Sequence, residues 1–487
     1  MAELVPIANL RGPRGFQGIQ GLPGVNATPA DEAVAGYIST GGTSATQSAA
    51  DARYGSTMYA LAYGVVGDGT ADDAAAFAAL LNTAATFGAS VTLEAGSTLL
   101  VGATIAPPSG TRLFGNGAEV KKKSTLAGVG FNIGAVSDVL VENLRVDGQK
   151  ALFASSEHQH GFYIVNGAER ITLRGIYVHD CNGDGIYVGD QTAASKSIVI
   201  ENVFSHANNR QGMSISHVSG LSCSNSWFTA TNGTNPRAGV DIEPNADGIV
   251  CENITFTSCR FAGNGHFGFV VAGRAAPTVH HGAISLVGCH IYGNGTASAS
   301  FGGGLNLRAA RGFSMIGGSI HHNIGPGVRM DWTTICTDIK LVGVEIYENS
   351  QHGFQVTSGF DDLSIEACTF RGNGTGNPGA YAGIGFYPTI ASTNLKVIGN
   401  TSGGATQRYG LQTSVTSGAI SNVTLVGNEY PGNGTGARAL ADDAATRLDL
   451  DRVGKVTVTG SRGGNAALAS MLTGLATRGI ITDSTTA

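Results

Sequence analysis

The sequence is poor in charged residues of either sign. They make up 13% of its 487 residues, and the formal net charge is -6. Such a chain offers neither a basic surface for nucleic acid nor a polybasic patch for a membrane. Its one basic cluster, Lys121 to Lys123, is typical of a solvated turn. We therefore expect no nucleic-acid partner.

The cysteines suit neither a disulfide framework nor a metal site. There are seven, an odd number, and no CxxC or Cys/His cluster with metal spacing occurs. Cys259, Cys289 and Cys368 share one inward column of a repeated strand, which predicts small buried hydrophobes. A disulfide between Cys259 and Cys289 stays open as an alternative. The sequence predicts no metal and no other cofactor.

Long apolar segments are missing too. No run is long enough to span a bilayer, so membrane insertion is not expected. The first residues, Met-Ala-Glu-Leu-Val-Pro, have neither a basic n-region nor an apolar h-region, so we expect no signal peptide.

Glycine, in contrast, is abundant, with 73 residues, about double the roughly 7% of ordinary proteins. From Gly161 to Val415, a glycine followed by alternating apolar and variable residues recurs. The intervals run from 23 residues (Gly304 to Gly327) to 36 (Gly268 to Gly304). Period-two alternation predicts strands, and the recurrent return length predicts a repeat architecture. Tight corners that need positive φ would account for the excess of glycine.

Two or three short strands per repeat, with no helix between them, favour an all-β, right-handed parallel β-helix. Its coils would lie about 4.8 Å apart, so each column of the repeat becomes a ladder along the axis. Apolar columns such as Ile186/Val188 and Val240/Ile242 are predicted to stack inward. No coil can bury its own apolar face, so the stack is stable only as an array. Any function must then lie on the outward columns.

Other segments flank the β-helix, which we predict over residues 59–435. Residues 1–26 hold four Gly-X-Y triplets, the collagen pattern that requires three chains; a flexible linker is the alternative. Residues 27–58 predict a helical collar or trimerisation segment. Residues 436–487 are predicted to be either a cap or a trimer clamp.

A capping helix is predicted over residues 70–87, where Thr70 and Asp73 have the spacing of a capping box. We expect it to cover the open first coil. Asp68, Asp72 and Asp73 would serve turns and the cap rather than catalysis. Its apolar face comprises Phe77, Leu80, Leu81 and Ala84.

The segment Gly67-Asp-Gly-Thr-Ala-Asp-Asp73, followed by this helix, resembles the entry segment of pectate-lyase-like β-helix proteins, which include bacteriophage tailspikes. With the repeats, the resemblance covers residues 60–435. The first 55 residues resemble the N-termini of minor tail proteins from phages of actinobacteria, and residues 458–472 resemble phage tail sequences. The resemblance implies a virion (phage tail) protein made in the bacterial host cytoplasm, with other tail proteins and host cell-surface carbohydrate as partners.

Candidate site residues come from neighbouring outward positions. Asp241 and Glu243 are carboxylates about 7 Å apart along one strand, and with Asp184 they suit the paired carboxylates of a glycosidase. The arginine base of pectate lyases has no counterpart at the outward positions beside Asp241. The candidate ligand-binding residues are Tyr187, His217, Asp190 and Trp332.

Three functions fit these features. The first is a homotrimeric tailspike or tail fibre that binds a host surface glycan. The second is a tailspike depolymerase, a glycoside hydrolase or polysaccharide lyase acting on an envelope polysaccharide. The third, a free bacterial pectin-type lyase, is disfavoured by the missing signal peptide and the collagen-like leader. Arg308 and Asp331 are further predicted to form an ion pair between coils.

Overall fold

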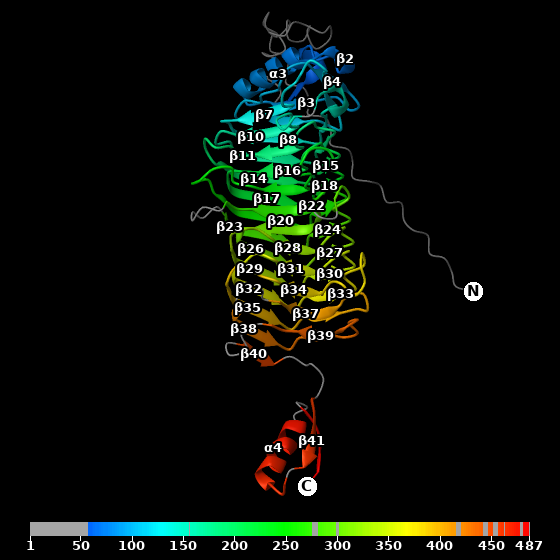
Figure 1. The fold of residues 1–487 in the computed structure, drawn as a ribbon. Helices are drawn as coiled ribbons and strands as arrows, with labels where there is room; N and C mark the ends of the chain where they lie inside the picture. Colours follow the sequence, from blue (N-terminus) through cyan, green and yellow to red (C-terminus); the bar gives the residue numbers. More distant parts are fainter. Residues whose placement is uncertain are drawn as a thin grey trace, which may run out of the picture. The chain divides into compact units, whose positions relative to one another are not determined.

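The computed structural model describes residues 57–154, 156–274, 281–298, 301–414, 420–441, 447–450, 456–461, 463–477 and 481–486. The predicted leader and collar lie outside these residues, except for Thr57 and Met58. Three parallel sheets surround one core, and the predicted right-handed parallel β-helix is confirmed (Figure 1).

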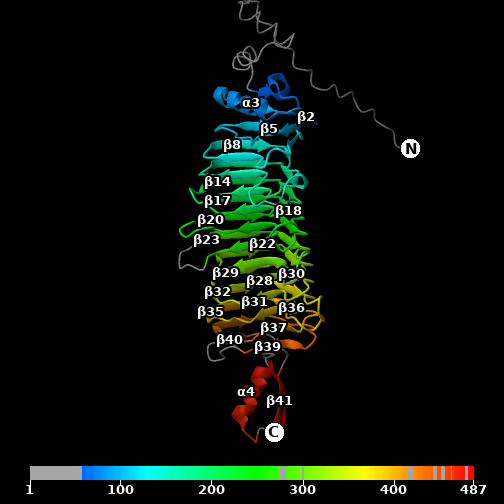
Figure 2. The ribbon, with the colours of Figure 1, turned by 45° about the horizontal axis from the view of Figure 1, so that its top comes forward.

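Each coil contributes strands to the three sheets in turn (Figure 2). Sheet A has 15 strands, from β1 (Thr57–Tyr59) to β40 (Arg447–Leu450). Sheet B has 13, from β2 (Asp68–Asp72) to β36 (Thr401–Gly403), and sheet C has 12, from β7 (Phe131–Gly134) to β39 (Gly436–Ala439). The stack thus extends past residue 435, because β39 and β40 still pair with the coil before them.

The three-residue strands of sheet C show how the core forms. In β13 (Ile186–Val188) and β16 (Met213–Ile215), the first and third side chains are buried in the core and stack on their counterparts in the next coil. The middle residue points outward, as the alternation predicts. The other strands of sheet C are β10 (Phe162–Val165), β19 (Val240–Ile242), β22 (Phe267–Ala272), β25 (Gly303–Arg308), β28 (Val328–Met330), β31 (Phe354–Val356), β34 (Ile384–Phe386) and β37 (Tyr409–Thr413).

Glycine serves two different purposes in the coil. At the corner between sheets A and B the backbone is left-handed, with φ of 62° at Gly175 and 59° at Gly288, as the tight corners predict. The repeated glycine before each strand of sheet C has another reason. A Cβ on Gly239 would lie 2.5 Å from the carbonyl oxygen of Gly268 in the next coil. The coils approach too closely there for any side chain.

Ladders of hydrogen-bonded asparagine side chains pair the buried backbone polar groups at the turns inside the stack. Asn264, Asn294 and Asn323 are fully buried, and each side-chain amide donates to the next asparagine Oδ1 at 2.9 Å. Cysteines fill an inward column, as expected: Cys259 and Cys289 are buried free thiols, so the alternative of a disulfide between them is not realised. These ladders hold successive coils in register.

Helix α3 (Ala74–Phe87) contacts the first coil through β1, β3 (Ser90–Thr92) and β4 (Thr98–Val101). It begins four residues after Thr70, because residues 68–72 form β2, and the expected capping box is not formed. The Asp73 carboxylate instead accepts from the backbone N–H of Val66 at 2.6 Å and of Gly67 at 3.1 Å. The apolar face is buried as predicted, with Phe77, Leu80, Leu81 and Ala84.

The C-terminal described residues form a small βαβ unit. Strands β41 (Val456–Ser461) and β42 (Ile481–Thr486) pair in parallel, and α4 (Ala466–Thr477) connects them. Of the helices in the described part of the chain, none is long and apolar enough to cross a membrane.

Candidate functional site

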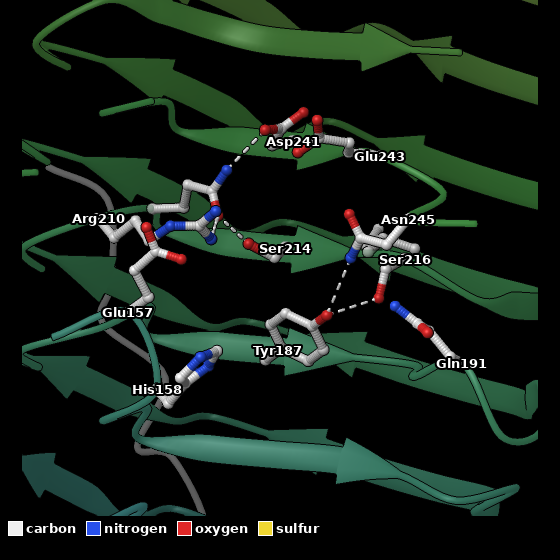
Figure 3. A pocket seen from close by; sticks show the side chains of 12 residues that line it. Glu157, His158, Tyr187, Gln191, Arg210, Ser214, Ser216, Asp241, Glu243 and Asn245 are labelled. Atoms are coloured by element: carbon white, nitrogen blue, oxygen red, sulfur yellow. Dashed lines mark hydrogen bonds between the residues drawn. The ribbon is translucent and has the colours of Figure 1, made fainter. Parts of the chain in front are cut away.

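Two adjoining pockets form a groove on the outer face of sheet C. They have volumes of about 320 and 640 Å³, and Asp241 and Glu243 line both. The smaller pocket, drawn in Figure 3, is largely polar, and aromatic side chains line the larger. The groove therefore has a polar half and a second half, here called the apolar half for its rings, although Arg237, His266 and Arg308 also line it. The two halves meet at two carboxyl groups.

The register of sheet C determines which side chains line the polar half of the groove. Tyr187, Ser214 and Asp241 are the middle residues of β13, β16 and β19, and they pair in register across the three coils. Their side chains therefore form one outward column. The turn before β16 adds Arg210 and Gln211, which line the same pocket. Figure 3 shows Arg210 there.

Asp241 is much less exposed to solvent than the sequence predicts. It points outward from its strand, but it is only 4% exposed, because the side chain of Gln211 lies against it. Gln211 Nε2 donates to Asp241 Oδ2 at 2.6 Å, and Asp241 Oδ1 has no hydrogen-bond partner among the described residues. Burial, and then the negative charge of Glu243, raise the pKa of Asp241. Glu243 itself is exposed.

The sequence predicts Asp184 on the exposed face, but it is fully buried and lies beneath the pocket. Its Oδ2 accepts from Ser214 Oγ at 2.8 Å and lies 3.5 Å from Arg210 Nη1. Arg210 Nη1 also donates to Gln211 Oε1 at 2.8 Å, so a hydrogen-bonded path joins Asp184 to Asp241. Burial raises the pKa of Asp184 to about 7, although Arg210 opposes the shift.

Aromatic rings form the wall next to Asp184. His160 is 1% exposed and stacks on Tyr163 at 5.4 Å, and its ring centroid lies 4.9 Å from that of Tyr187. Burial lowers the pKa of His160 to about 3, so its ring is neutral. The Tyr187 hydroxyl accepts from Ser216 Oγ at 2.8 Å and from Asn245 Nδ2 at 3.4 Å (Figure 3).

Several buried polar atoms here have no hydrogen-bond partner within the described part of the chain. They are Asp184 Oδ1, Asp241 Oδ1, His160 Nε2, Gln159 Oε1 and Arg210 Nε. Buried polar atoms are nearly always paired in folded proteins, and an unpaired one costs about 1 to 3 kcal/mol. Their concentration around one pocket marks a site that is not optimised for stability.

The apolar half of the groove offers ring surfaces. Trp332 is 48% exposed and Phe301 63% exposed, and buried Phe267 and Val270 lie beside them. The Arg308 guanidinium lies 5.5 Å from the Trp332 ring centroid. Arg308 Nε also lies 3.4 Å from Asp331 Oδ1, which confirms the predicted ion pair between coils.

The structure thus brings Asp241, Glu243, Tyr187 and Trp332 into one groove, with Asp184 beneath it. Asp190 and His217, the other two predicted residues, lie outside both pockets. Asp190 Oδ1 accepts from the backbone N–H of Thr192 at 3.0 Å, and His217 Nδ1 lies 2.8 Å from the Asp190 carbonyl oxygen. The first contact belongs to a turn, and the second joins neighbouring coils.

Sequence reasoning missed the residues that turns and loops supply to the groove. They are Glu157, His158, Gln191, Arg210, Gln211, Asn235, Pro236, Arg237, Asn245, His266 and Phe301. Arginines do therefore lie in the groove with Asp241: Arg210 comes from a turn, and Arg308 is the last residue of β25. The run Arg210-Gln211 directly before the repeated Gly212 was the available signal.

A separate trio of possible metal ligands lies on sheet B. One ligand atom each of Glu119, Asp147 and His179 lies within 4.8 Å of the others. Lys121 Nζ lies 3.5 Å from Glu119 and 3.9 Å from Asp147, and Arg145 Nε lies 3.4 Å from Glu119. These cations already neutralise both carboxylates, so the trio is accounted for by ion pairs.

Comparisons with known proteins identify a family and several solved structures with this architecture. The family described as "Right handed beta helix region" matches residues 109–284 and 249–402. No curated protein matches the sequence.

Similar solved structures share little sequence identity with this chain. The A-module of the mannuronan C-5 epimerase AlgE6 of Azotobacter vinelandii aligns with a TM-score of 0.53 at 17% identity, covering 81% of this chain and 98% of that one. An N-terminal fragment of gene product 12 of bacteriophage phi29 aligns at 0.54 and 16%, covering 83% and 75%. PfbA, a surface adhesin of Streptococcus pneumoniae, aligns at 0.50 and 14%, covering 75% and 93%. Such identities show a shared fold.

Proposed function

We propose that this chain, which belongs to the right-handed β-helix family, is a bacteriophage tail protein that binds a host cell-surface glycan in the groove of sheet C. The observation that carries the binding proposal is the pairing of exposed rings, Trp332 and Phe301, with polar side chains around Asp241 and Glu243. Sugars present apolar ring faces and hydroxyl groups together, and this groove offers a complement to both.

The tail assignment has separate support. It rests on the tailspike-like entry segment at residues 67–73 and on the collagen-like triplets, for which we propose a homotrimer. Other tail proteins would then be its partners in the virion, and synthesis would take place in the host cytoplasm. The solved structures of this fold include a phage gene product and a bacterial adhesin, so the fold is compatible with the assignment.

Tryptophan fluorescence tests glycan binding directly, because the chain has only two tryptophans. Trp332 lies in the groove, and Trp227 lies on sheet B. We would titrate the full chain with a panel of purified bacterial envelope polysaccharides. Trp332→Ala should weaken binding about tenfold, or about 1.4 kcal/mol, through loss of the stacking surface. Calorimetric titration measures the affinity of this variant, because it lacks the fluorescent ring in the groove.

The matched control is Trp227→Ala, which removes the same side chain at 38% exposure from another face. It should leave the affinity for the polysaccharide unchanged. Equal affinities for both variants would remove the groove from the proposal. A chain that binds none of the polysaccharides would remove glycan binding itself.

One observation favours cleavage of the bound glycan as a second candidate function. Glycoside hydrolysis needs one protonated and one ionised carboxyl group. Asp241 is buried and favours its neutral form, whereas Glu243 beside it is exposed. Asp241 would donate its proton to the glycosidic oxygen as the bond to the sugar breaks, and Glu243 would take a proton from the attacking water.

The same polysaccharides test cleavage. Wild type should release new reducing ends, and Asp241→Asn and Glu243→Gln should each lower the rate at least 100-fold. Polysaccharide binding, measured through Trp332, should persist in both variants. If the products are unsaturated sugars, the bond is broken by β-elimination and not by water. Unchanged polysaccharide with wild type would leave glycan binding as the function.

A further inference from the structure

The outer face of sheet B carries a continuous stripe of rings and guanidinium groups. It follows nine successive strands, so it is about 38 Å long at about 4.8 Å per coil. These strands are β9 (Arg145–Asp147), β12 (Tyr177–His179), β15 (Phe204–His206), β18 (Trp227–Thr229), β21 (Arg260–Ala262), β24 (His290–Tyr292), β27 (Ser319–His321), β30 (Glu345–Tyr347) and β33 (Thr369–Arg371). We name this surface the aromatic stripe, and its members are Arg145, Tyr177, Phe204, Trp227, Arg260, His290, Tyr292, His321, Tyr347 and Arg371.

The first half of the stripe is a stack closed by arginine at both ends. The Arg145 guanidinium lies 4.7 Å from the Tyr177 ring centroid, and Tyr177 stacks on Phe204 at 5.3 Å and 14°. Phe204 meets Trp227 edge to face at 5.9 Å, and the Arg260 guanidinium lies 4.6 Å from the Trp227 ring.

The second half is a similar stack in the neighbouring column, with an arginine at one end. His321 stacks between Tyr292 at 5.1 Å and Tyr347 at 4.6 Å, with interplanar angles of 2° and 6°. The Arg371 guanidinium lies 4.2 Å from the Tyr347 ring.

This stacking makes the stripe a poor platform for sugars. The faces of the rings are turned toward each other along the axis, so mainly their edges face outward. A sugar needs an accessible ring face. Phe301 and Trp332 in the groove are more exposed than any ring of the stripe, although Arg308 lies over the Trp332 ring. The stripe has two shallow hollows, of about 370 Å³ beside Trp227 and about 440 Å³ beside Tyr347, which could receive side chains of a protein partner.

Composition also distinguishes this face from sheet A. Ion pairs between coils recur along the outer face of sheet A, such as Arg174 with Glu201 at 2.8 Å and Lys340 with Glu366 at 3.4 Å, with Val199 and Ile316 exposed between them. Such a charged face is satisfied in water. The ion pairs of sheet B gather near the two ends of the stripe, around Glu119 and Glu348. Protein interfaces are enriched in tyrosine, tryptophan and arginine and depleted in lysine, which matches the stripe and not sheet A.

We propose that the aromatic stripe is the surface through which copies of this chain pack against one another, an inference that rests on the proposed homotrimer. Three chains joined through the triplets of residues 12–24 would hold their β-helices close together. The groove of sheet C must stay open for glycan, and sheet A is charged. Sheet B is the face that gains most from being covered by protein.

The experiment uses the full chain with Trp332→Phe, which leaves Trp227 as the only tryptophan. Size-exclusion chromatography with light scattering gives the mass, and acrylamide quenching reports whether Trp227 is covered. Tyr347→Glu places a charge in the stripe four coils away from Trp227. It should raise the quenching constant of Trp227 at least threefold, even where the leader keeps three chains together.

Val199→Glu is the matched control, because Val199 has nearly the same exposure as Trp227, 37%, but lies on sheet A in β14 (Ser195–Glu201). It should leave the quenching unchanged. Tyr347→Ala repeats the test without the new charge, and circular dichroism verifies that each variant is folded.

The outcomes separate this inference from the proposed function. A trimer in which Trp227 is quenched equally in the parent and in Tyr347→Glu overturns the inference and leaves the homotrimer intact. A monomeric parent overturns the homotrimer and the inference together. Shielding of Trp227 that appears only on adding envelope polysaccharide would make the stripe a glycan site and overturn the inference.

Discussion

Sheets B and C are built from the same coils, yet they treat polar and aromatic side chains in opposite ways. On sheet B the rings of the aromatic stripe are stacked on a neighbour or covered by an arginine, except His290, whose Nδ1 lies 2.8 Å from Ser319 Oγ. On sheet C, Asp184 and Asp241 are buried with one oxygen unpaired, and Trp332 and Phe301 stand exposed. Where contacts within the chain are complete, the face contributes to stability; where they are incomplete, the face is available to a ligand.

The largest expected effect tests whether the floor of the groove costs stability. Burial raises the pKa of Asp184 to about 7 in the folded protein, from 3.8. The folded chain therefore holds a proton that the unfolded chain has released, and stability falls as the pH rises from 5 to 8. Asp184→Asn should remove this loss, so its stability relative to wild type should grow by about 2 to 3 kcal/mol over that range.

Thermal unfolding of both proteins at pH 5, 6, 7 and 8 measures this difference. Asp190→Asn is the control, because Asp190 is a partly exposed aspartate whose contacts are those of a turn. A constant difference between Asp184→Asn and wild type across the series would show that Asp184 carries no buried proton.

The next effect compares a phenylalanine from each face. Phe204→Ala removes stacking on Tyr177 and the edge contact with Trp227. It should lower the free energy of unfolding by about 1 to 2 kcal/mol, because the ring is half-buried and each aromatic pair adds about 0.5 to 1.5 kcal/mol. Phe301→Ala should change stability by less than about 0.5 kcal/mol, since that ring is 63% exposed.

Chemical denaturation measures both values, and polysaccharide binding should show the reverse order, with Phe301→Ala the more harmful variant. If Phe301 proves as important for stability as Phe204, the contrast between the two faces is lost.

The smallest effect concerns two arginines that lie over tryptophan rings. Arg260→Gln should cost about 0.5 kcal/mol, the typical cation–π contribution at an exposed site, by uncovering Trp227. Arg308→Gln removes a similar contact to Trp332 but lies in the groove. Its cost in stability should be similar, about 0.5 to 1 kcal/mol, because the ion pair with Asp331 is lost as well. Unlike Arg260→Gln, it should also alter the affinity for polysaccharide, which calorimetric titration would detect. An altered affinity in Arg260→Gln would contradict the separate roles of the two faces.

The repeat pattern predicts much of this molecule because it leaves few ways to bury apolar side chains. Ile186 and Val188 flank one outward residue in a three-residue strand, so their burial follows from the alternation. The same alternation correctly sets Tyr187, Ser214 and Asp241 in one outward column. It could not show that Asp241 is covered, because Gln211 belongs to the turn of the coil before.

Corners and loops explain the other differences. The length of each turn varies between coils, so a linear pattern does not show which turn folds over the sheet. Arg210 reaches Asp184 from such a turn, 26 residues along the chain. The repeated glycine was identified from the sequence, but its close approach to the next coil depends on how tightly the coils stack.

The sequence alone determined the parallel β-helix, its inward columns and the helix that covers its first coil. It did so because period-two alternation with a recurrent coil length can hide its apolar residues only by stacking. Tertiary structure alone decided which outward residues became buried acids, which rings stayed open and which rings closed on one another. Those outcomes depend on contacts between coils, where residues about 25 to 35 positions apart meet at the ordinary distance between strands.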